Sequence, residues 1–527
     1  MGGDRCSSFL AFSAAQPSFL QPVTWGQNHQ RFCISTARHC QNGSHDELGR
    51  RIVGSYRWRA PVNGHRRVAS RSLDLLVGHL NMEAVQSSSR LQRTSYCRVF
   101  EMVAHQDCRQ WQSIPGLLGG YQEVRFNCSQ YRRSPWYDGM RFDPANNNIL
   151  SWRDEDEHFK LRSKMSAGYG GREVENLEPK IDKNILALIK LLRKYAEENK
   201  PVDLGRRAQF FTLDVLSDLA FGEPFGFLET DSDVYEYIKT TEETLPMVMV
   251  TTVVPWLVKV LSSPIFKSLL PSEKDRLGFG RVMGIAKAIT AERFGPDKKV
   301  QKDMLGSFVA HGLTQKEAES EILLQIIAGS DTTATAIRST MLHIITSPRV
   351  YNKLRTEISK TTYSEPIIPD SIGRDLTYLQ AVIKEGLRIF PPVAGLMSKE
   401  VPPQGDTWKG QFIPGGTSVG YCAWGIFRRE DIWGSDAGEF RPERWIESPP
   451  EKIKEMESAL DLIFSYGRWQ CLGRPVALME LNKIYFELFR QFDFSICDPT
   501  KPWKVFNCGI FSQSGLWVRV EPRVTGS

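Results

Sequence analysis

A long apolar segment of the sequence carries an acid and an alcohol side by side in its middle. The stretch "LTQKEAESEILLQIIAGSDTTATAIRSTMLHIITSP" has a capping box at Thr314 and a stop at Pro348, which predicts one long helix. Weak helix formers interrupt its apolar pattern around Asp331 and Thr332. With the small Ala328 beside them, this pair indicates a groove for a small ligand next to a proton relay. The alternative is that the hydroxyl groups simply bond back to preceding carbonyls.

A single cysteine lies in a glycine-flanked turn directly ahead of a second apolar-periodic run. The turn is "FSYGRWQCLGRP", with Cys471 between Gly467 and Gly473, and the run is "VALMELNKIYFELF". The ten cysteines are too scattered for a disulfide framework and lack zinc or iron–sulfur spacing, which indicates a reducing compartment. A lone Cys is ordinarily a small buried apolar residue. We interpret three others in that way: Cys422, Cys497 and Cys508.

Two further segments carry charged residues at regular spacing. "TYLQAVIKEGLRIFPP" predicts a helix that begins at a Thr-x-x-Gln cap on Thr377, and on it Glu385 and Arg388 lie three residues apart. "FRPERW", Phe440–Trp445, adds Arg444 between a proline turn and an aromatic residue. Taken alone, the Glu385 and Arg388 pair is a surface ion pair worth a few tenths of a kcal/mol.

The elements that must position these residues are mainly helices from about Ser129 onward. "EPKIDKNILALIKLLRKYAEE" predicts one helix, and "FFTLDVLSDLAFGEPFGF" predicts a second that Gly222 and Pro224 stop. The apolar run Leu245–Leu261 contains two prolines and two threonines. We interpret it as a buried or interfacial loop rather than a membrane span.

Composition separates the first 120 residues from the rest of the chain. With 527 residues and 41% hydrophobic content, the chain can bury a large core. The net charge of +6 comes from residues 1–120, which contain 14 Arg, no Lys and 7 acidic residues. The near-neutral remainder excludes a general nucleic-acid binder. We expect residues 1–120 to be a disordered, loosely packed Arg/Ser-rich extension, and residues 121–527 to be the working domain.

Together these pieces resemble the cytochrome P450 family of heme-thiolate monooxygenases. The segments "AGSDTT", "EGLR", "FRPERW" and "FSYGRWQCLG" follow the family's order, and the likeness covers about residues 129–520. Within the family, three segments are most similar to the fungal branch that includes pisatin demethylase: "QYRRSPWYDGMRFDP", "LAFGEPFGF" and "GRWQCLGRP". The resemblance implies the cytochrome P450 fold, mainly α with a small β region, lacking the usual N-terminal helix and strands.

The resemblance also places Cys471 at the heme iron as the axial thiolate. A thiolate donates electron density that favours O–O cleavage, and it must be shielded and hydrogen-bonded to backbone amides. Gly467 and Gly473 let the loop turn tightly enough to bring those amides close. The helix that starts near Arg474 would direct its positive end toward the sulfur.

Other positions are assigned by the same resemblance. Asp331 and Thr332 would deliver protons to dioxygen, and Glu385, Arg388 and Arg444 would form a buried charge network that supports the heme-side loop. The remaining heme contacts implied are His158, Arg162, Ala328, Lys399, Phe464, Arg468 and Gly473.

One position departs from the family pattern. The family usually has Arg two residues before the Cys to pair a heme propionate, whereas this chain has Trp469. We expect heme binding to survive, with the propionate bound by other basic groups. By the same resemblance, Val393–Leu396 and Ile510–Phe511 are expected to line an apolar substrate cavity, with Ile327 and Ala328 above the heme, although plain core packing explains these apolar residues equally well.

The leading hypothesis is a monooxygenase that inserts one atom of dioxygen into a small lipophilic substrate, a fungal secondary metabolite. Electrons would come from NADPH through an NADPH-cytochrome reductase. The family implies the cytosolic face of the endoplasmic reticulum membrane, with peripheral membrane contact and no recognisable transmembrane anchor. No nucleic-acid partner is expected.

Two alternatives stay open. A heme-thiolate isomerase or dehydratase would need no external electrons, and the Asp331–Thr332 pair argues against it. A non-catalytic pseudoenzyme, N-terminally incomplete and either heme-binding or misfolded, is the other. In the family, the region before residue 129 supplies an anchor, a hinge, the first helix and most strands of the main sheet, and none is recognisable here.

Overall fold

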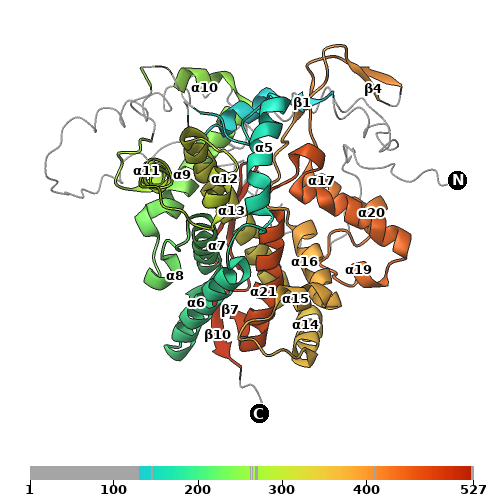
Figure 1. Cartoon of the computed structure of the whole chain (residues 1–527). Coiled ribbons are helices and arrows are strands. Elements are labelled where there is room, and N and C mark those ends of the chain that lie inside the picture. Colours follow the sequence, from blue (N-terminus) through green and yellow to red (C-terminus); the bar gives the residue numbers. More distant parts are fainter. Residues whose placement is uncertain are drawn as a thin grey trace, which may run out of the picture. The chain divides into compact units, whose positions relative to one another are not determined.

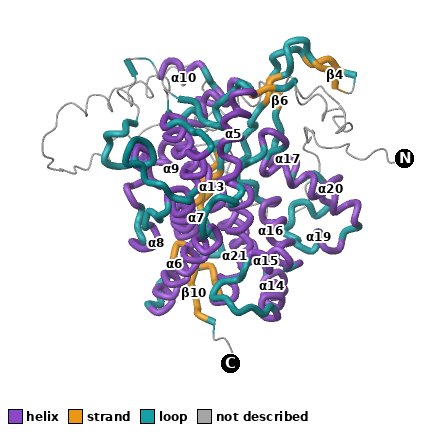
Figure 2. The backbone as a smooth tube through the Cα atoms, in the orientation of Figure 1, coloured by secondary structure: helices purple, strands orange, loops and turns teal. Residues whose placement is uncertain are grey.

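The structure is a computed structural model that describes residues 130–523, except 144–145, 262, 264, 267–270 and 409. The expectations for residues 1–120 lie outside this part of the chain. Within it, helices predominate and the strands are short, as Figure 2 shows in purple and orange. The predicted fold class, mainly α with a small β region, is confirmed.

The helices have these bounds: α5 Glu155–Tyr169, α6 Leu177–Glu197, α7 Leu204–Phe221, α8 Phe227–Thr230, α9 Tyr237–Val253, α10 Trp256–Leu261, α11 Gly278–Ala291, α12 Met304–Ala310, α13 Gln315–Ile345, α14 Pro348–Lys360, α15 Asp370–Asp375, α16 Thr377–Ile389, α17 Ala423–Ile426, α18 Glu430–Trp433, α19 Arg444–Glu447, α20 Pro450–Leu460 and α21 Arg474–Gln491. Short 3₁₀ segments are η2 Pro135–Met140, η3 Val234–Glu236, η5 Asp461–Phe464 and η6 Gly467–Trp469.

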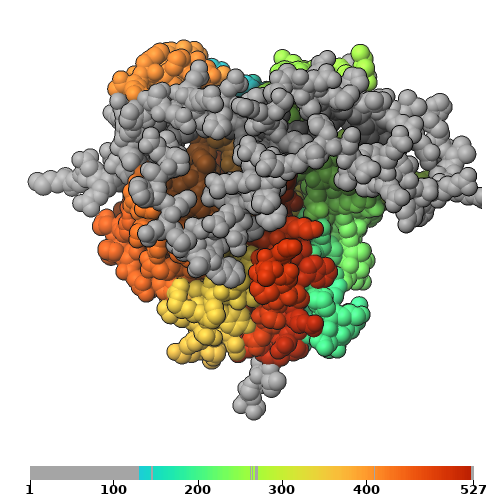
Figure 3. Space-filling model, turned by 180° about the vertical axis from the view of Figure 1, so that it is seen from behind, coloured from blue at the N-terminus to red at the C-terminus, as the bar shows by residue number. Residues whose placement is uncertain are grey.

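The strands pair in small antiparallel groups. They are β1 Arg132–Arg133, β2 Val202–Asp203, β3 Lys399–Glu400, β4 Asp406–Trp408, β5 Gln411–Ile413, β6 Ser418–Val419, β7 Phe492–Ile496, β8 Lys504–Asn507, β9 Phe511–Ser514 and β10 Trp517–Pro522. The sheet orders are β1-β3-β6, β2-β10-β7, β4-β5 and β8-β9. Within the second sheet, β10 pairs with β7 in the register Val520↔Phe494. Figure 3 shows the red C-terminal segment at the surface between the yellow α14 and the blue-green α6.

The helix predicted around the acid–alcohol pair is confirmed as α13, which spans 31 residues. Its capping box is complete: the Thr314 side chain accepts from the Glu317 amide, and the Glu317 carboxylate accepts from the Thr314 amide at 2.7 Å. α13 lies at the centre of the helical array, between α7 and α16 (Figure 1), and also contacts α21. Neighbours on several sides explain why weak helix formers in its middle do not interrupt it.

Two other predicted helices are confirmed, and their sequence signals act as expected. α6 buries Ile181, Ile185, Leu188 and Leu192, which recur at helical spacing. α7 ends at Gly222, whose φ of 95° lies in the left-handed region that glycine adopts without strain.

The predicted cap of α16 is wrong. The residue before its first turn is Leu376, which has no side-chain hydrogen bond to the helix. Instead, the carboxylate of Glu357 on α14 accepts hydrogen bonds from the amides of Tyr378 and Leu379, both at 2.8 Å. A carboxylate from a neighbouring helix satisfies the unpaired amides and favours the positive helix end, so a local cap is not needed.

The apolar run Leu245–Leu261 is helical rather than a loop. It forms the second half of α9, with Pro246 inside the helix, followed by the short α10. Pro255 separates the two helices because it cannot continue the hydrogen-bond ladder. Across the described residues, no helix combines the length and the apolar character that crossing a membrane requires.

Helices α13 and α16 approach each other closely at a glycine. A Cβ atom on Gly386 would lie 1.9 Å from Oγ1 of Thr340 and 2.9 Å from its Cβ atom. Gly386 separates Glu385 from Leu387 on the buried face of α16. The absence of a side chain at residue 386 therefore sets the distance between the central helix and the helix that carries Glu385 and Arg388.

We predict that Gly386→Ala lowers the free energy of unfolding by about 2–3 kcal/mol or more, because overpacking forces the two helices apart. Urea unfolding measures the change. Thr340→Ala removes the atom that clashes most, so Gly386→Ala/Thr340→Ala should recover part of the loss. A double variant as unstable as the sum of both single variants would contradict this account.

Candidate active site

A cavity of about 310 Å³ lies between the middle of α13 and the loop that precedes α21. Its wall is mostly apolar, and it brings together residues far apart in the sequence. From α13 come Ala328 and Thr332, and from the loop come Phe464, Cys471 and Gly473. These five predicted site residues therefore surround one space.

Cys471 presents its side chain to this cavity from a tightly held loop. The Cys471 amide donates to the carbonyl of Phe464 at 2.7 Å, and Gly467 has a φ of 62°, as the turn requires. Burial raises the pKa of the Cys471 thiol, and hydrogen bonds from the amides of Gly473 and Arg474 oppose that rise. The amides at the start of α21 thus favour the thiolate, but burial is the larger effect on the pKa of the thiol.

The acid and the alcohol of α13 have different partners. Thr332 lines the cavity, and its Oγ1 donates to the carbonyl of Ala328 at 2.8 Å, which is the back-bonding alternative considered above. Asp331 accepts a hydrogen bond from Nε2 of Gln209 at 2.5 Å. Burial raises the pKa of Asp331, while the charge of Arg338 opposes the shift. A carboxyl that retains its proton more readily can act as a proton donor.

Four cations gather around His158 at one edge of the cavity: Arg133, Arg162, Lys399 and Arg468. His158 is buried, and its Nε2 lies 3.1 Å from Nη2 of Arg133. Burial, followed by the charges of Arg133 and Arg162, lowers the pKa of His158 to about 3, so the ring is neutral at pH 7. Both ring nitrogens lie near protein groups, since Nδ1 is 3.8 Å from Glu155.

The predicted heme contacts fall into two groups. His158 and Arg162 line the cavity, as do Ala328, Phe464 and Gly473. Lys399 and Arg468 are not among the described residues that line it. Lys399 donates to the Tyr137 hydroxyl and to the Met397 carbonyl, and burial, followed by Arg133, lowers its pKa to about 7. The side chain of Arg468 is 38% exposed.

The substrate-lining expectation holds for part of its residues. Val393 lines the cavity, and its neighbour Met397 also does. Ile510 pairs with Val393 through an isolated β-bridge, and Phe511 packs in the hydrophobic core. Neither of these two lies among the described lining residues.

The chemistry of this wall fits a heme. A heme is a flat apolar ring with two carboxylates at one edge, and its iron takes a thiolate in oxygen-activating enzymes. The cavity offers an apolar wall, one thiol and a cationic edge. Nε of Arg133, at that edge, is buried and has no hydrogen-bond partner among the described residues. A buried donor without a partner favours an anion beside it.

Glu385, Arg388 and Arg444 meet as expected, and all three are completely buried. Arg388 binds both carboxylate oxygens of Glu385, at 2.7 and 2.9 Å, and Arg444 adds a contact of 3.0 Å. The indole of Trp445 and the amide of Arg441 also donate to Glu385. Away from the cavity lining, this cluster supports the segment that leads to the Cys471 loop.

Among the residues that sequence reasoning missed in the cavity lining are an arginine and a glutamate. Arg133 lies in β1 and approaches His158. Glu480 on α21 is 5% exposed, and its Oε2 atom is buried without a hydrogen-bond partner among the described residues. Burial raises the pKa of Glu480 well above 4.5. Neither residue sits in a distinctive motif, so only the folded arrangement identifies them.

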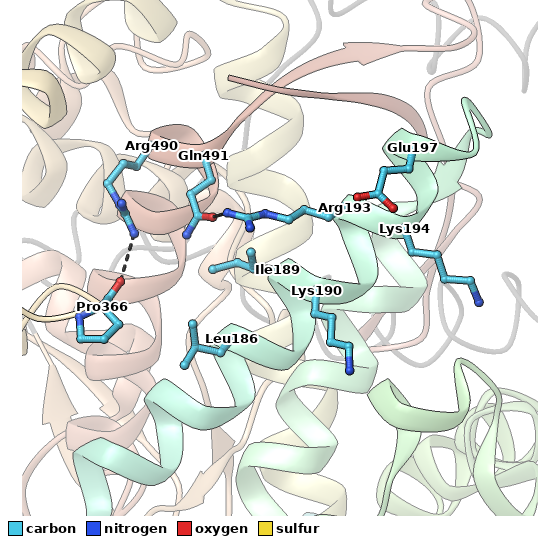
Figure 4. A pocket seen from close by; sticks show the side chains of 9 residues that line it. All are labelled: Leu186, Ile189, Lys190, Arg193, Lys194, Glu197, Pro366, Arg490 and Gln491. Carbon is cyan, nitrogen blue, oxygen red and sulfur yellow. Dashed lines mark hydrogen bonds between the residues drawn. The ribbon is translucent and has the colours of Figure 1, made fainter. Parts of the chain in front are cut away.

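A second hollow is a shallow surface groove of about 620 Å³ between α6 and the end of α21 (Figure 4). Its described lining contains no thiol and no acid–alcohol pair. Arg193 donates to Gln491 at 2.5 Å, and Arg490 donates to the carbonyl of Pro366 at 3.1 Å. Lys190 and Lys194 extend toward solvent. We therefore place the chemistry in the cavity beside Cys471.

Comparison with known proteins decides the family. The sequence profile described as Cytochrome P450 matches residues 125–515, about three quarters of the chain. The chain belongs to the cytochrome P450 family. It is accordingly an oxidoreductase of the monooxygenase type, which implies a heme-thiolate centre, dioxygen and a redox partner.

Several fungal relatives are similar over most of their length. Cytochrome P450 monooxygenase ABA1 of Pyricularia oryzae is 45% identical over 408 residues, which cover 75% of this chain and 80% of that protein. Cytochrome P450 monooxygenase aba1 of Botryotinia fuckeliana is 42% identical over 403 residues, or 74% and 79% of the two chains. Cytochrome P450 monooxygenase abl1 of Leptosphaeria maculans is 37% identical, with 75% and 71% covered. The finer likeness to pisatin demethylase stays a prediction.

We predict that Glu480 makes the protein less stable as pH rises. A folded-state pKa above the unfolded value of 4.5 contributes stability that is lost between those two pKa values. The loss is about 1.4 kcal/mol per pH unit within that window. Glu480→Gln removes the titration, so its free energy of unfolding relative to wild type should increase from pH 5 to pH 8. Urea unfolding at several pH values measures this difference, and a pH-independent difference would refute the prediction.

Proposed function

We propose that this P450 inserts one atom of dioxygen into a small lipophilic substrate, a fungal secondary metabolite. The observation that carries the proposal is one cavity lined by both Cys471 and Thr332. Asp331 precedes Thr332 in α13, but its carboxylate binds Gln209 and is not among the described lining residues. Heme bound in this cavity would supply the chemistry of dioxygen activation. Electrons would come from NADPH through an NADPH-cytochrome reductase, as the family implies.

Residues of this chain would bind the iron, supply protons and bind the substrate. Cys471 would hold the iron, and the amides at the start of α21 would stabilise its negative charge. Asp331, with its raised pKa, would supply protons, and Thr332 would hand them into the cavity. The apolar lining from Leu324, Val393 and Met397 would bind the substrate and exclude water.

Arg133, Arg162 and Lys399 would supply charge at the propionate edge, in place of the arginine that the family usually carries two residues before the Cys. Of these, Arg133 and Arg162 line the cavity, whereas Lys399 is not among the described lining residues and pairs with Arg133 in the β1–β3 register. Arg468 contributes to the same positive region from the surface. The clustering of these cations at one edge of the cavity supports their proposed role in binding the propionates.

We also propose peripheral contact with the cytosolic face of the endoplasmic reticulum membrane. Trp256 and Val260 on α10 are exposed, as are Ile265 and Leu277 beyond it. Exposed apolar side chains gathered in one part of the sequence suit an interfacial contact. Co-sedimentation with lipid vesicles is the measurement that tests this contact.

We predict that Cys471→Ser abolishes the thiolate-type Soret band of the reduced carbon-monoxide complex. Serine cannot supply the soft, strongly donating sulfur ligand. The expectation of a buried residue is right for Cys508 but wrong for Cys422 and Cys497, which are exposed. Cys497→Ser is therefore the matched control, because Cys497 is an exposed free thiol outside the cavity, and it should retain the band. A band that survives in Cys471→Ser would refute the ligand assignment. Failure of wild type to take up heme would favour the non-catalytic alternative.

We predict that Thr332→Ala uncouples NADPH consumption from product formation. Loss of a positioned proton donor typically costs a factor of about 100 or more in the step that uses it, so NADPH should instead be spent on peroxide release. The ratio of product formed to NADPH consumed measures the coupling. Thr346→Ala is the control, because Thr346 is exposed at the end of α13, and it should couple like wild type. Turnover that needs neither NADPH nor reductase would identify the isomerase or dehydratase alternative instead.

A further inference from the structure

The two residues directly before Cys471 are both bound to helix α5. The indole Nε1 of Trp469 donates to the two carboxylate oxygens of Glu155, at 3.1 and 3.0 Å. Nη1 of Arg162 donates to the carbonyl of Gln470 at 2.7 Å. Glu155 and Arg162 are seven residues apart, so they lie on the same face of the helix two turns apart. One face of α5 therefore holds the loop at two points.

Glu155 is free for this contact because its neighbour caps the helix. The side chain of Asp154 accepts from the amides of Asp156 and Glu157, so the first turn of α5 does not need the Glu155 carboxylate. The Glu155 side chain is only 16% exposed and points at Trp469. A carboxylate in the first turn also lies at the positive end of the helix, which stabilises its charge.

The surroundings explain why tryptophan suits residue 469. Nζ of Lys399 lies 4.6 Å from the centre of the Trp469 ring, and the guanidinium of Arg468 lies 5.7 Å from it. An arginine at 469 would add one more positive charge to a group that already holds several. Indole instead offers a neutral N–H to Glu155 and a π face to Lys399, both favourable contacts.

We propose that Glu155 is a positioning residue for Cys471: through the Trp469 indole it latches the Cys471 loop onto α5. We call this contact the Glu155–Trp469 latch. The inference rests on the proposed role of Cys471 as the heme ligand, because the latch matters for function only if the position of the thiol does. With the latch intact, residues 466–472 stay closed over the cavity. Without the indole hydrogen bonds, the loop keeps the Arg162 contact and the weaker 4.0 Å ion pair between Arg468 and Glu155, and it opens more often.

The test compares two variants that break the latch in different ways. Trp469→Phe keeps the ring but removes the N–H, and Glu155→Gln keeps an acceptor but removes the charge. Glu157→Gln is the control, since Glu157 lies on the same turn but binds the exposed Lys160. Hydrogen exchange of the peptide spanning residues 466–472, measured by mass spectrometry on the purified holoprotein, reports how often the loop opens.

Loss of a charge-assisted hydrogen bond should increase exchange of this loop about 10- to 100-fold in Trp469→Phe and in Glu155→Gln. The double variant should exchange no faster than Glu155→Gln alone, which also weakens the Arg468 ion pair, and Glu157→Gln should match wild type. Glu155→Asp should recover part of the protection. Unchanged exchange in the single variants, or additive effects in the double variant, would overturn the latch.

The heme reduction potential provides a second readout that a purely structural role would not move. Glu155→Gln removes a negative charge beside the cationic edge and should raise the potential, whereas Trp469→Phe removes no charge and should leave it close to wild type. Equal potentials in both variants would contradict the charge placement. A failed ligand assignment is distinguishable, because Cys471→Ser would then keep the thiolate-type band while the exchange results still report on the latch.

Discussion

A fully buried carboxylate held between two arginines fixes the heme-side half of this protein. Glu385 accepts hydrogen bonds from Arg388, Arg444 and Trp445, and the two guanidinium groups go on to bind backbone carbonyls of residues 427–439. Removal of one partner from such a cluster leaves an unpaired buried charge, which costs about 3–5 kcal/mol. The chain between α16 and α19 has only short regular elements, so its path depends on these contacts. The Cys471 loop follows directly from that path.

The middle of α13 places polar side chains inside the protein, and a hydrogen-bonded series of side chains satisfies them. Gln209 donates to Asp331 and accepts from Arg338, and Arg338 also donates to Gln513 at 3.0 Å. Thr335 donates to the same Gln513 oxygen. Each acceptor in this chain has a donor, so α13 can carry an acid at its centre without the full cost of desolvation. The apparent conflict between local composition and helix formation is therefore resolved by α7 and β9, which lie elsewhere in the sequence.

This difference also explains what the sequence could and could not predict. The capping box of α13, the glycine end of α7 and the Glu385–Arg388 spacing are local signals, and each predicts its element or contact from a few adjacent residues. The start of α16 depends on Glu357 of another helix, so its local Thr-x-x-Gln pattern was misleading. Arg133, Gln209 and Glu480 carry no motif. Their partners, or their lack of partners, arise only when distant segments pack together.

The positive charges at one edge of the cavity couple heme binding to the folding of that edge. Arg133, Arg162, Lys399 and Arg468 surround His158, and Glu155, which acts on Arg133, Lys399 and Arg468, offsets only part of their charge. The lowered pKa values of His158 and Lys399 both have the repulsion of Arg133 among their causes. Two propionates would add the negative charges that this edge favours, so heme should bind the folded edge more tightly than any loosened form. Binding that favours one form stabilises it in proportion to that preference. The protein can then tolerate Trp469 in place of an arginine, because what the edge requires is an ordered loop rather than another cation.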